Sequence, residues 1–356
     1  MTPNPAPTEP IVSIVLPTMN GAQFIGETID AILNQTLKNF ELIIVDDGST
    51  DNTAEVIKRY TDPRIRAVFQ ENQGVCRATN RGYAMARGKY LSRHDHDDIS
   101  LPTRFEKQVQ YLESHPEIDF VGCWAQIWTG GKPTGRIHKH PTTPGAIAFS
   151  LLFNSPFVHT ACLMRKAVFS GTGGYTLDPE RIPPEDYECF SRISRSFNMA
   201  NIPECLVIYQ EVANSMSSML RAEQSPAKKR FVSNLVRISS ENLAFASGLQ
   251  CANQMTDDFG ALTHQDYTRL TARYNYAAMR DLVIQAAKDI ALRFHEPAVL
   301  TLLKEKLLWL DYQYHTQQGN TYHWVRLKYL YLNRPFHENF GSIGRLFNKC
   351  NPFRAA

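Results

Sequence analysis

The segment GKYLSRHDHDDISLP, residues 88–102, restricts the possible folds most strongly, because an apolar, β-rich run is followed by three aspartates and two histidines. Two earlier apolar runs, at 11–18 and 41–48, also end in polar or turn residues. Near-continuous apolar runs of this length are typical of strands covered on both faces of a parallel sheet. We therefore expect a sheet whose strands end in polar side chains.

Apolar residues at helical spacing alternate with these strands. Ile25, Ile29 and Ile32 lie four and three residues apart, which is one face of a helix between the first two strands. Ser100 and Pro102 are expected to start a helix that runs to about Ser114. The alternation predicts an α/β unit, Rossmann-like, with a mostly parallel sheet flanked by helices. The expected strands are 11–18, 41–48, 64–70, 89–95, 119–128 and 204–210, and further helices are expected at 75–86 and 184–197.

The chain divides into three segments by composition. Residues 1–10, MTPNPAPTEP, lack a charged region followed by an apolar run, so we expect a disordered lead-in and not a signal peptide. Beyond about residue 220 the pattern is helical, and the polar, interrupted stretch at 218–230 suggests a boundary. We expect one unit over 11–218 and a helical C-terminal region over 219–356.

Charge and cysteine content exclude some classes of protein. With 38 Lys and Arg against 35 Asp and Glu, the net charge of +3 argues against a dedicated nucleic-acid binder. The seven cysteines are scattered and contain no C-x-x-C pair, which indicates reduced thiols in a cytoplasmic protein. No uninterrupted window of 18 apolar residues exists, so no membrane-spanning segment is expected.

Polar side chains follow three of the expected strands at the points where these strands end. In open α/β sheets, ligands bind beyond the carboxyl ends of the strands. Aspartate, asparagine and glycine also form turns and cap helices, and for DDGSTDN taken alone that reading is the stronger one. The residues at the strand ends are Thr18, Asn20, Asp46, Asp47, Asp95, Asp97 and Asp98.

The acidic cluster at 94–98 is harder to explain as a turn. If the strand continues, Asp95 and Asp97 lie on one side, opposite His94, His96 and Asp98. Neighbouring carboxylates repel each other unless a cation lies between them, and Mg²⁺ or Mn²⁺ often completes its shell with substrate phosphates. A capped, solvated turn would need only one acid. We therefore expect a metal–diphosphate site, with packing or supporting roles for the histidines.

Several motifs in order resemble the family 2 glycosyltransferases, which have the GT-A fold. They are SIVLPTMN, FELIIVDDGSTDNT, and the run NQGVCRATNRGYAMARGKYLSRHDHDDISLPTRFEKQVQYLESHPEIDFVG, followed by GGYTLDPERIPPEDYECFSRIS. The resemblance covers roughly residues 11–217. It implies a GT-A catalytic domain with a nucleotide-binding half at 11–115 and an acceptor-binding half at 116–218. It also implies inverting transfer of a sugar from a nucleotide-diphosphate donor, most often UDP-linked, with Mn²⁺ or Mg²⁺.

The resemblance assigns the nucleotide site to the first two strand ends. Pro17, Thr18 and Asn20 would line the nucleotide pocket. Asp47 would accept a hydrogen bond from the base, and Asp46 would support the turn. The family often has tyrosine at the position of Met19, so stacking on the base is expected to come from elsewhere. Arg77 stands two positions before an arginine of many relatives, and a contact with phosphate is its candidate role.

The chemistry is assigned to the remaining acids. Asp97 of the D-x-D pair would bind the metal, and Asp95 would contact the ribose or the shell of the metal. Asp98 would face hydroxyls of the donor sugar. Asp186 of PED would be the general base that takes the proton of the acceptor hydroxyl, with Glu185 orienting it or contacting the acceptor. Without the other motifs, PPEDYE would be an acidic first turn favoured by the helix dipole.

Two assignments keep alternatives. His159 contacts acceptor or metal, or is a packed, hydrogen-bonded histidine. The last 36 residues hold six Lys and Arg and eight aromatic residues. Such a segment can bind an anionic membrane surface, which would suit a lipid-linked or other glycan acceptor in bacterial surface polysaccharide synthesis at the inner face of the cytoplasmic membrane. A helix packed on the catalytic domain, or a homodimer contact, is the other reading.

Two other function classes fit parts of the chain. A non-catalytic protein that binds nucleotide sugars or glycans would share the fold, although D-x-D and Asp186 together argue for catalysis. A phosphohydrolase is suggested by VDDGST, but Val45 stands where that class needs its nucleophilic aspartate. The expected partners are therefore a nucleotide sugar and a glycan or lipid-linked acceptor, with no nucleic acid.

Overall fold

The computed structural model describes residues 9–212 and 225–318. The chain forms two units, residues 1–300 and 301–356, and the described part of the second belongs to helix α12 (Val299–Gln317). The basic, aromatic segment of the last 36 residues lies outside the described residues, and so do its predicted contacts with a membrane or a second copy. In the described residues no helix combines the length and the apolar character needed to cross a membrane.

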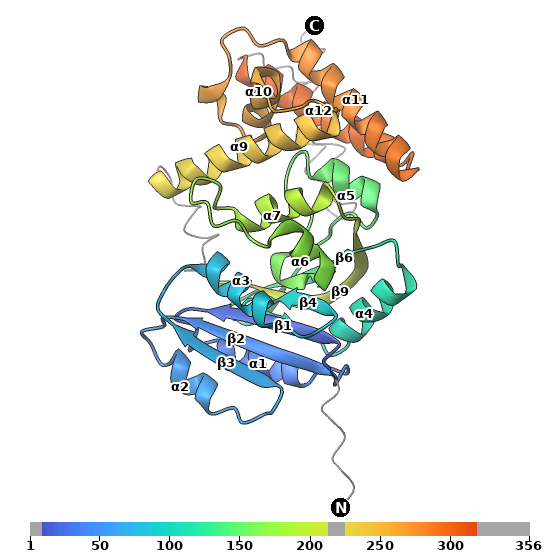
Figure 1. The fold of residues 1–356 in the computed structure, drawn as a ribbon. Helices are drawn as coiled ribbons and strands as arrows, with labels where there is room; N and C mark the ends of the chain where they lie inside the picture. Colours follow the sequence, from blue (N-terminus) through green and yellow to red (C-terminus); the bar gives the residue numbers. More distant parts are fainter. Residues whose placement is uncertain (1–8, 213–224, 319–356) are drawn as a thin grey trace, which may run out of the picture. The chain divides into compact units, whose positions relative to one another are not determined.

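The first unit is built on one mixed sheet (Figure 1). Its strands follow the order β3-β2-β1-β4-β8-β6-β9-β5, with β7 paired to β6. The strands β3, β2, β1 and β4 run parallel, so their carboxyl ends meet at one edge. The strands are β1 (Val12–Thr18), β2 (Phe40–Asp47), β3 (Ile65–Gln70), β4 (Tyr90–Arg93), β5 (Ile99–Ser100), β6 (Phe120–Thr129), β7 (Lys132–His138), β8 (Leu163–Arg165) and β9 (Met199–Glu211).

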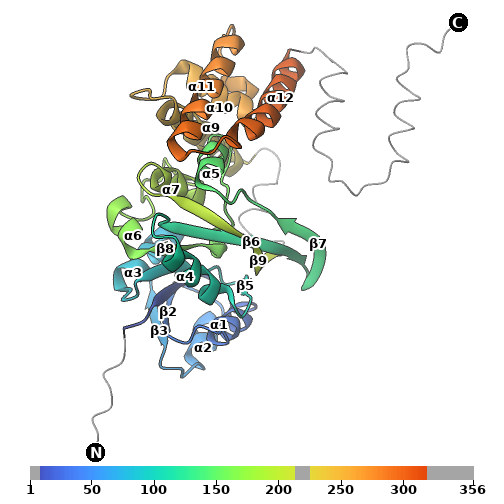
Figure 2. The same cartoon turned by 90° about the vertical axis from the view of Figure 1, so that its right-hand side faces the viewer.

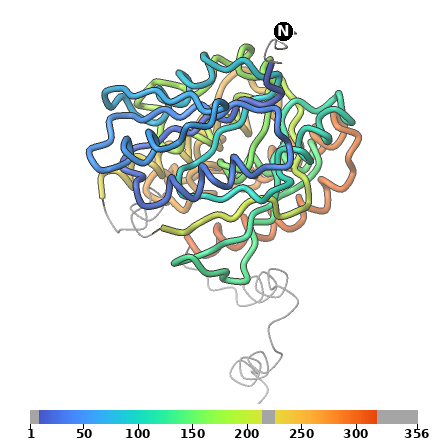
Figure 3. The backbone as a smooth tube through the Cα atoms, turned by 90° about the horizontal axis from the view of Figure 1, so that it is seen from below, coloured from blue at the N-terminus to red at the C-terminus, as the bar shows by residue number. Residues whose placement is uncertain are grey.

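Helices cover both faces of the sheet because its buried side chains alternate. Ile14 and Leu16 of β1 pack toward α1, α2 and α4, whereas Val15 packs toward α3, α6 and α7. Figure 3 views the side on which α1 and α2 lie, and Figure 2 shows β6 and β7 extending from the sheet. The helices are α1 (Ile25–Leu33), α2 (Thr53–Lys58), α3 (Val75–Met85), α4 (Arg104–Ser114), α5 (Pro144–Ser150), α6 (Lys166–Thr172) and α7 (Glu185–Ser194).

The acidic segment is shaped differently from the expectation. The strand β4 ends at Arg93, so the segment 94–98 is not extended and its side chains do not alternate between two faces. The hydroxyl of Thr28 donates to the carbonyls of His96 (2.8 Å) and Asp98 (3.0 Å), which holds the segment in a turn. Residues 99–100 then pair with β9, so the helix predicted from Ser100 begins at Arg104 instead.

In the part of the C-terminal region that the structure describes, three α-helices belong to the first unit. They are α9 (Pro226–Ala246), α10 (Gln254–Thr263) and α11 (Tyr276–Phe294). The hydroxyl of Ser225 accepts the Lys228 amide at 3.1 Å and caps α9. Helix α9 packs against α7, and α11 packs against α5 and α9. The domain boundary predicted at 218 falls within 213–224, outside the described residues.

Candidate active site

The first two strand ends are tied together by Asn20. Its side-chain oxygen accepts the amide of Thr50 at 2.8 Å, and its own amide donates to the hydroxyl of Ser49 at 2.9 Å. Asn20 has φ +54°, a left-handed conformation that asparagine tolerates better than most residues. Pro17, buried within β1, lies in register with Val45 of β2. The loops that follow β1 and β2 therefore form one edge.

Thr18 connects this edge to the acidic turn. Its hydroxyl lies 3.2 Å from Nδ1 of His96. Gly21 packs directly against both residues, since a Cβ there would lie 2.8 Å from Oγ1 of Thr18 and 2.9 Å from Cγ of His96. Only glycine allows this approach without a shift of the neighbours.

The two acids at the end of β2 shape loops. The carboxylate of Asp47 accepts hydrogen bonds from Nε2 of Gln70 (2.6 Å) and from the amides of Gln73 (2.9 Å) and Gly74 (2.8 Å). Asp46 accepts the amide of Ser49 at 3.0 Å and so supports the turn after β2. Both aspartates are buried. Asp47 thus fixes the start of α3, where Arg77 lies with its side chain exposed to solvent.

Asp95 is held by a buried arginine. The guanidinium of Arg93, only 6% exposed, contacts both carboxylate oxygens of Asp95 at 2.7 and 3.1 Å. The amide of Asp95 donates to the hydroxyl of Thr160 at 3.1 Å. A bidentate arginine–carboxylate pair fixes geometry as well as charge. His94 is buried, with its ring nitrogens 2.7 Å from the carbonyl of Asp95 and 2.8 Å from the hydroxyl of Ser100, which is the packing role expected for it.

The two following acids have unfavourable surroundings for negative charge. Burial, followed by the charge of Asp95, raises the pKa of Asp97. Burial and the charges of Asp97 and Asp95 raise the pKa of Asp98 well above its ordinary value. Asp98 is 1% exposed, and its Oδ1 accepts the amide of Gln210 of β9 at 2.9 Å. Its carboxyl group therefore contacts the sheet in this structure.

The acidic turn fits a divalent ion whose shell is completed by substrate. Among the described residues, no group of three or more His, Cys, Asp and Glu side chains is arranged to hold a metal by itself. Mg²⁺ and Mn²⁺ sites that use one or two carboxylates and substrate phosphates do not need such a group. Since Arg93 occupies both oxygens of Asp95, Asp97 is the carboxylate of the pair that is left for a cation.

Asp186 lies in the first turn of α7, among three acidic side chains. Burial, followed by the charge of Glu185, raises the pKa of Asp186 to about 6, and Arg93 acts in the opposite direction. Arg93, while it is paired with Asp95, also lines a small cavity with residues 189–190 of α7, about one turn after Asp186. The sequence pattern does not single out Arg93. Its only signal is a charged residue in a buried strand, two positions before an acid.

His159 is part-buried among aromatic side chains. Its Nε2 lies 2.7 Å from the hydroxyl of Tyr175, and its ring meets Phe190 edge to face, with centroids 5.7 Å apart. Burial, followed by the charge of Arg93, lowers its pKa well below the ordinary value. It lines, with Arg93 and Tyr175, a cavity of about 20 Å³, which has room for one water molecule.

The sequence matches a known family and several of its members. The sequence model of the family described as glycosyl transferase family 2 matches residues 13–172. An uncharacterized glycosyltransferase of Haemophilus influenzae is 32% identical over 247 residues, which are 66% of this chain and 74% of that protein. A Bacillus subtilis relative, TuaG, whose name assigns it to teichuronic acid biosynthesis, is 29% identical over 216 residues, covering 59% of this chain and 82% of the relative.

Solved structures share the fold at low sequence identity. The S. aureus protein TarS 1–349, in complex with UDP-GlcNAc, is 16% identical with a TM-score of 0.56, covering 89% of this chain and 91% of that one. A mannosyltransferase from Pyrobaculum calidifontis, in complex with GDP-Man and Mn²⁺, is 19% identical with a TM-score of 0.50, covering 93% and 90%. These similarities and the mixed sheet flanked by helices confirm the predicted GT-A fold with C-terminal helices.

Proposed function

The chain belongs to glycosyltransferase family 2, and from this premise we propose that it transfers a sugar, with inversion, from a nucleotide-diphosphate donor to a hydroxyl group. The proposed donor is a UDP-sugar and the proposed acceptor is a glycan or a lipid-linked glycan of a bacterial surface polysaccharide. The relatives support this choice by name, since one is assigned to teichuronic acid biosynthesis and one neighbour was solved with UDP-GlcNAc.

One observation carries the proposal: Arg93, which holds Asp95 of the acidic turn, lines one small cavity together with Cys189 and Phe190 of α7, the helix whose first turn carries Asp186. Inverting transfer requires two functions opposite each other across the anomeric carbon. One function stabilises the leaving diphosphate and the other removes the proton of the acceptor hydroxyl. The acidic turn would hold the cation that stabilises the diphosphate, and Asp186 of α7, whose pKa is raised, would take the proton.

In this proposal Asp186 is the general base. Its carboxylate accepts the proton of the acceptor hydroxyl while that oxygen forms a bond to the anomeric carbon. The bond between the anomeric carbon and the diphosphate breaks in the same step, and the diphosphate leaves with the electron pair. A base with a pKa of about 6 is ionised at neutral pH yet remains basic enough to accept a proton. Glu185 contributes by raising that pKa through its charge.

The remaining residues bind the donor. Thr18, Asn20 and Asp47 form the wall of the nucleotide pocket at the aligned strand ends, with Pro17 and Asp46 beneath them. A Mn²⁺ or Mg²⁺ ion held by Asp97, when bound, supplies the positive charge that stabilises the departing diphosphate. Asp95 is held in place by Arg93 and faces the ribose or the shell of the ion. Asp98, Glu185 and His159 are proposed to border the sugars. Asp98 and His159 lie behind the surface of this site, because their side chains are packed against other residues of the protein.

The proposal is tested by turnover of nucleotide sugars. The protein is incubated with a panel of UDP- and GDP-linked sugars and with glycan acceptors, in Mn²⁺ or in chelator, and release of nucleoside diphosphate is measured. We expect release with one donor class that requires the metal. Donor binding without any turnover would instead favour a binding protein, and release of free phosphate from simple phosphomonoesters would favour a phosphohydrolase.

A further inference from the structure

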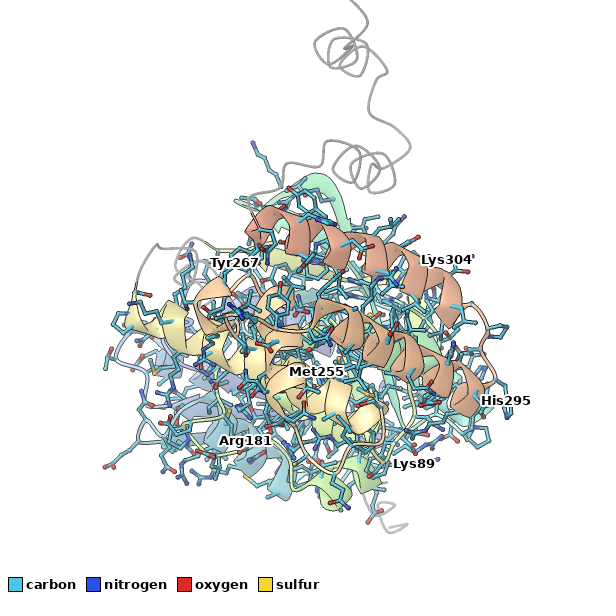
Figure 4. The ribbon with its side chains drawn as sticks, turned by 90° about the horizontal axis from the view of Figure 1, so that it is seen from above. Lys89, Arg181, Met255, Tyr267, His295 and Lys304 are labelled. Atoms are coloured by element: carbon cyan, nitrogen blue, oxygen red, sulfur yellow. The ribbon has the colours of Figure 1, made fainter. Side chains whose placement is uncertain are left out.

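Helix α9 presents one face of polar side chains to the segment that carries Asp186. Asn234, Arg237 and Glu241 lie three and four residues apart on α9, so they share a face of the helix. All three contact residues 181–183, the loop directly before α7. Figure 4 labels Arg181 of this loop beside the yellow helix α9. Sequence motifs of the catalytic unit end before this helix begins.

Arg181 is the centre of the contact. Its Nη2 and Nη1 donate to the two carboxylate oxygens of Glu241, at 2.9 and 3.3 Å. Its Nε donates to Glu188 of α7 at 3.2 Å, and Glu188 is buried two residues after Asp186. Arg237 adds to the network, since its guanidinium contacts Glu241 at 3.0 Å and the carbonyl of Arg181 at 3.1 Å. The loop and the first turn of α7 are thus bound to α9 by a continuous chain of charges.

Two hydrogen bonds from α9 hold the chain on either side of the base, one at a backbone carbonyl and one at a side chain. Nδ2 of Asn234, whose side chain is 4% exposed, donates to the carbonyl of Pro183 at 2.8 Å, three residues before Asp186. The hydroxyl of Tyr187, the residue that follows Asp186, lies 3.1 Å from the hydroxyl of Ser239 on α9. Both of these contacts come from the C-terminal region and flank a single carboxylate.

We propose that α9 is a positioning element for Asp186, and that Asn234 and Glu241 are its positioning residues. This inference rests on the proposed role of Asp186 as the general base. A base must lie within hydrogen-bond reach of the proton that it removes, and a displacement of about 1 Å can cost up to roughly a hundredfold in rate. The C-terminal helices are then part of the catalytic machinery, although they contribute no group that touches substrate.

The burial of these groups predicts where a substitution acts. The side chains of Arg181 and Glu241 are 32% and 24% exposed, so solvent screens part of their attraction. Because the pair belongs to a network, the thermal midpoint of each variant is needed to separate a loss of stability from a change in the placement of Asp186. The donor site at residues 95–98 is formed by other elements, so the affinity for the nucleotide sugar should not change.

The experiment compares the variants Glu241→Gln and Asn234→Ala of the full chain with a matched control. Glu204→Gln removes an exposed ion pair with Lys107 that likewise joins two elements, α4 and β9, outside the contact with α9. For each variant, kcat and KM for the nucleotide sugar, the Kd of the nucleoside diphosphate with Mn²⁺, and the thermal midpoint are measured. We expect kcat to fall about tenfold in the two α9 variants, with KM and Kd unchanged, and no change in Glu204→Gln.

A double-mutant cycle with Asp186→Asn separates positioning from general weakening. If Glu241 acts through Asp186, then Glu241→Gln adds no further loss of kcat to Asp186→Asn. Additive losses, a loss in the Glu204→Gln control as well, or wild-type kcat in both α9 variants would overturn the inference and leave the proposed function intact. Absence of turnover in the wild type with every donor would remove the proposed function and, with it, the role of α9.

Discussion

Replacement of Asp186 by asparagine removes the proposed general base while it preserves the shape of the side chain. General bases contribute typically 10²–10⁴-fold to a rate, which corresponds to about 3–5 kcal/mol in the activation free energy. We expect kcat for transfer to fall within this range in Asp186→Asn. The donor site lies on other elements, so the Kd of the nucleotide sugar in the presence of Mn²⁺ should equal that of the wild type.

The pH dependence of the wild type gives the same prediction a quantitative form. The base must be ionised to accept a proton, so activity is lost as pH falls through the pKa of Asp186, which is raised to about 6. At pH 6 about half of the base is ionised, and at pH 5 about a tenth. With saturating donor and metal, kcat/KM for the acceptor should therefore rise with pH and reach half its plateau near pH 6.

Glu185 offers a direct test of the cause of that pKa. Its charge raises the pKa of Asp186, so Glu185→Gln should move the acidic limb of the profile to lower pH. Glu180→Gln is the matched control, because Glu180 lies in the preceding loop with its side chain 85% exposed. The assay is initial-rate release of nucleoside diphosphate between pH 4.5 and 8, on the order of ten points per variant. Wild-type turnover in Asp186→Asn, or an acidic limb unaffected by both Asp186→Asn and Glu185→Gln, would refute the assignment.

Three further substitutions test the surroundings of the site. Arg93→Met removes the guanidinium that pairs with Asp95. It should lower the free energy of unfolding by about 2–3 kcal/mol in urea denaturation, which is less than the loss expected for a fully buried ion pair. Burial lowers the pKa of His264 to about 4, so the free energy of unfolding decreases as pH falls below about 6.5. In His264→Gln, urea denaturation should show about 2 kcal/mol less of this decrease between pH 7 and pH 5. The same decrease in the variant as in the wild type would contradict the prediction. Gly21→Ala forces a Cβ against Thr18 and should lower the free energy of unfolding by about 1–2 kcal/mol. It should also weaken nucleotide binding, as measured by calorimetry. Unchanged affinity and stability would argue against the close approach of Gly21 to Thr18.

The parallel half of the fold follows from the sequence because its signal is local and repeated. Apolar runs covered on both faces define β1, β2 and β4, and helical spacing defines the helices that connect the parallel strands. Parallel strands share one edge for their carboxyl ends, so the polar residues at that edge can be grouped from the sequence alone. Register confirms this grouping, since Thr18 pairs with Asp46 and Asp47 pairs with Gln70.

The segment 94–98 was not predictable from alternation. An alternating pattern of acids and histidines suggests an extended strand, but the hydroxyl of Thr28, nearly 70 positions earlier in the chain, binds two of its carbonyls and turns it. A strand of two residues such as β5 has no periodicity of its own, and it forms only because β9 lies beside it. Both features depend on partners distant in the sequence.

The contact between α9 and the loop before α7 is unpredictable for the same reason. Arg181 and Glu241 are separated by 60 positions, and each would be read alone as an ordinary surface charge. Arg93 is a related case. The sequence shows a charged residue within a buried strand, but only the fold shows that Arg93 pairs with Asp95 and lines a cavity with residues of α7.

The most direct test of the central claim is a crystal structure of the protein with a nucleoside diphosphate sugar and Mn²⁺. We predict that the metal binds Asp97, that the diphosphate lies against the turn at 95–98, and that the carboxylate of Asp186 faces the anomeric carbon from the opposite side. A diphosphate bound at another place in the fold, or an Asp186 carboxylate directed away from the sugar, would contradict it.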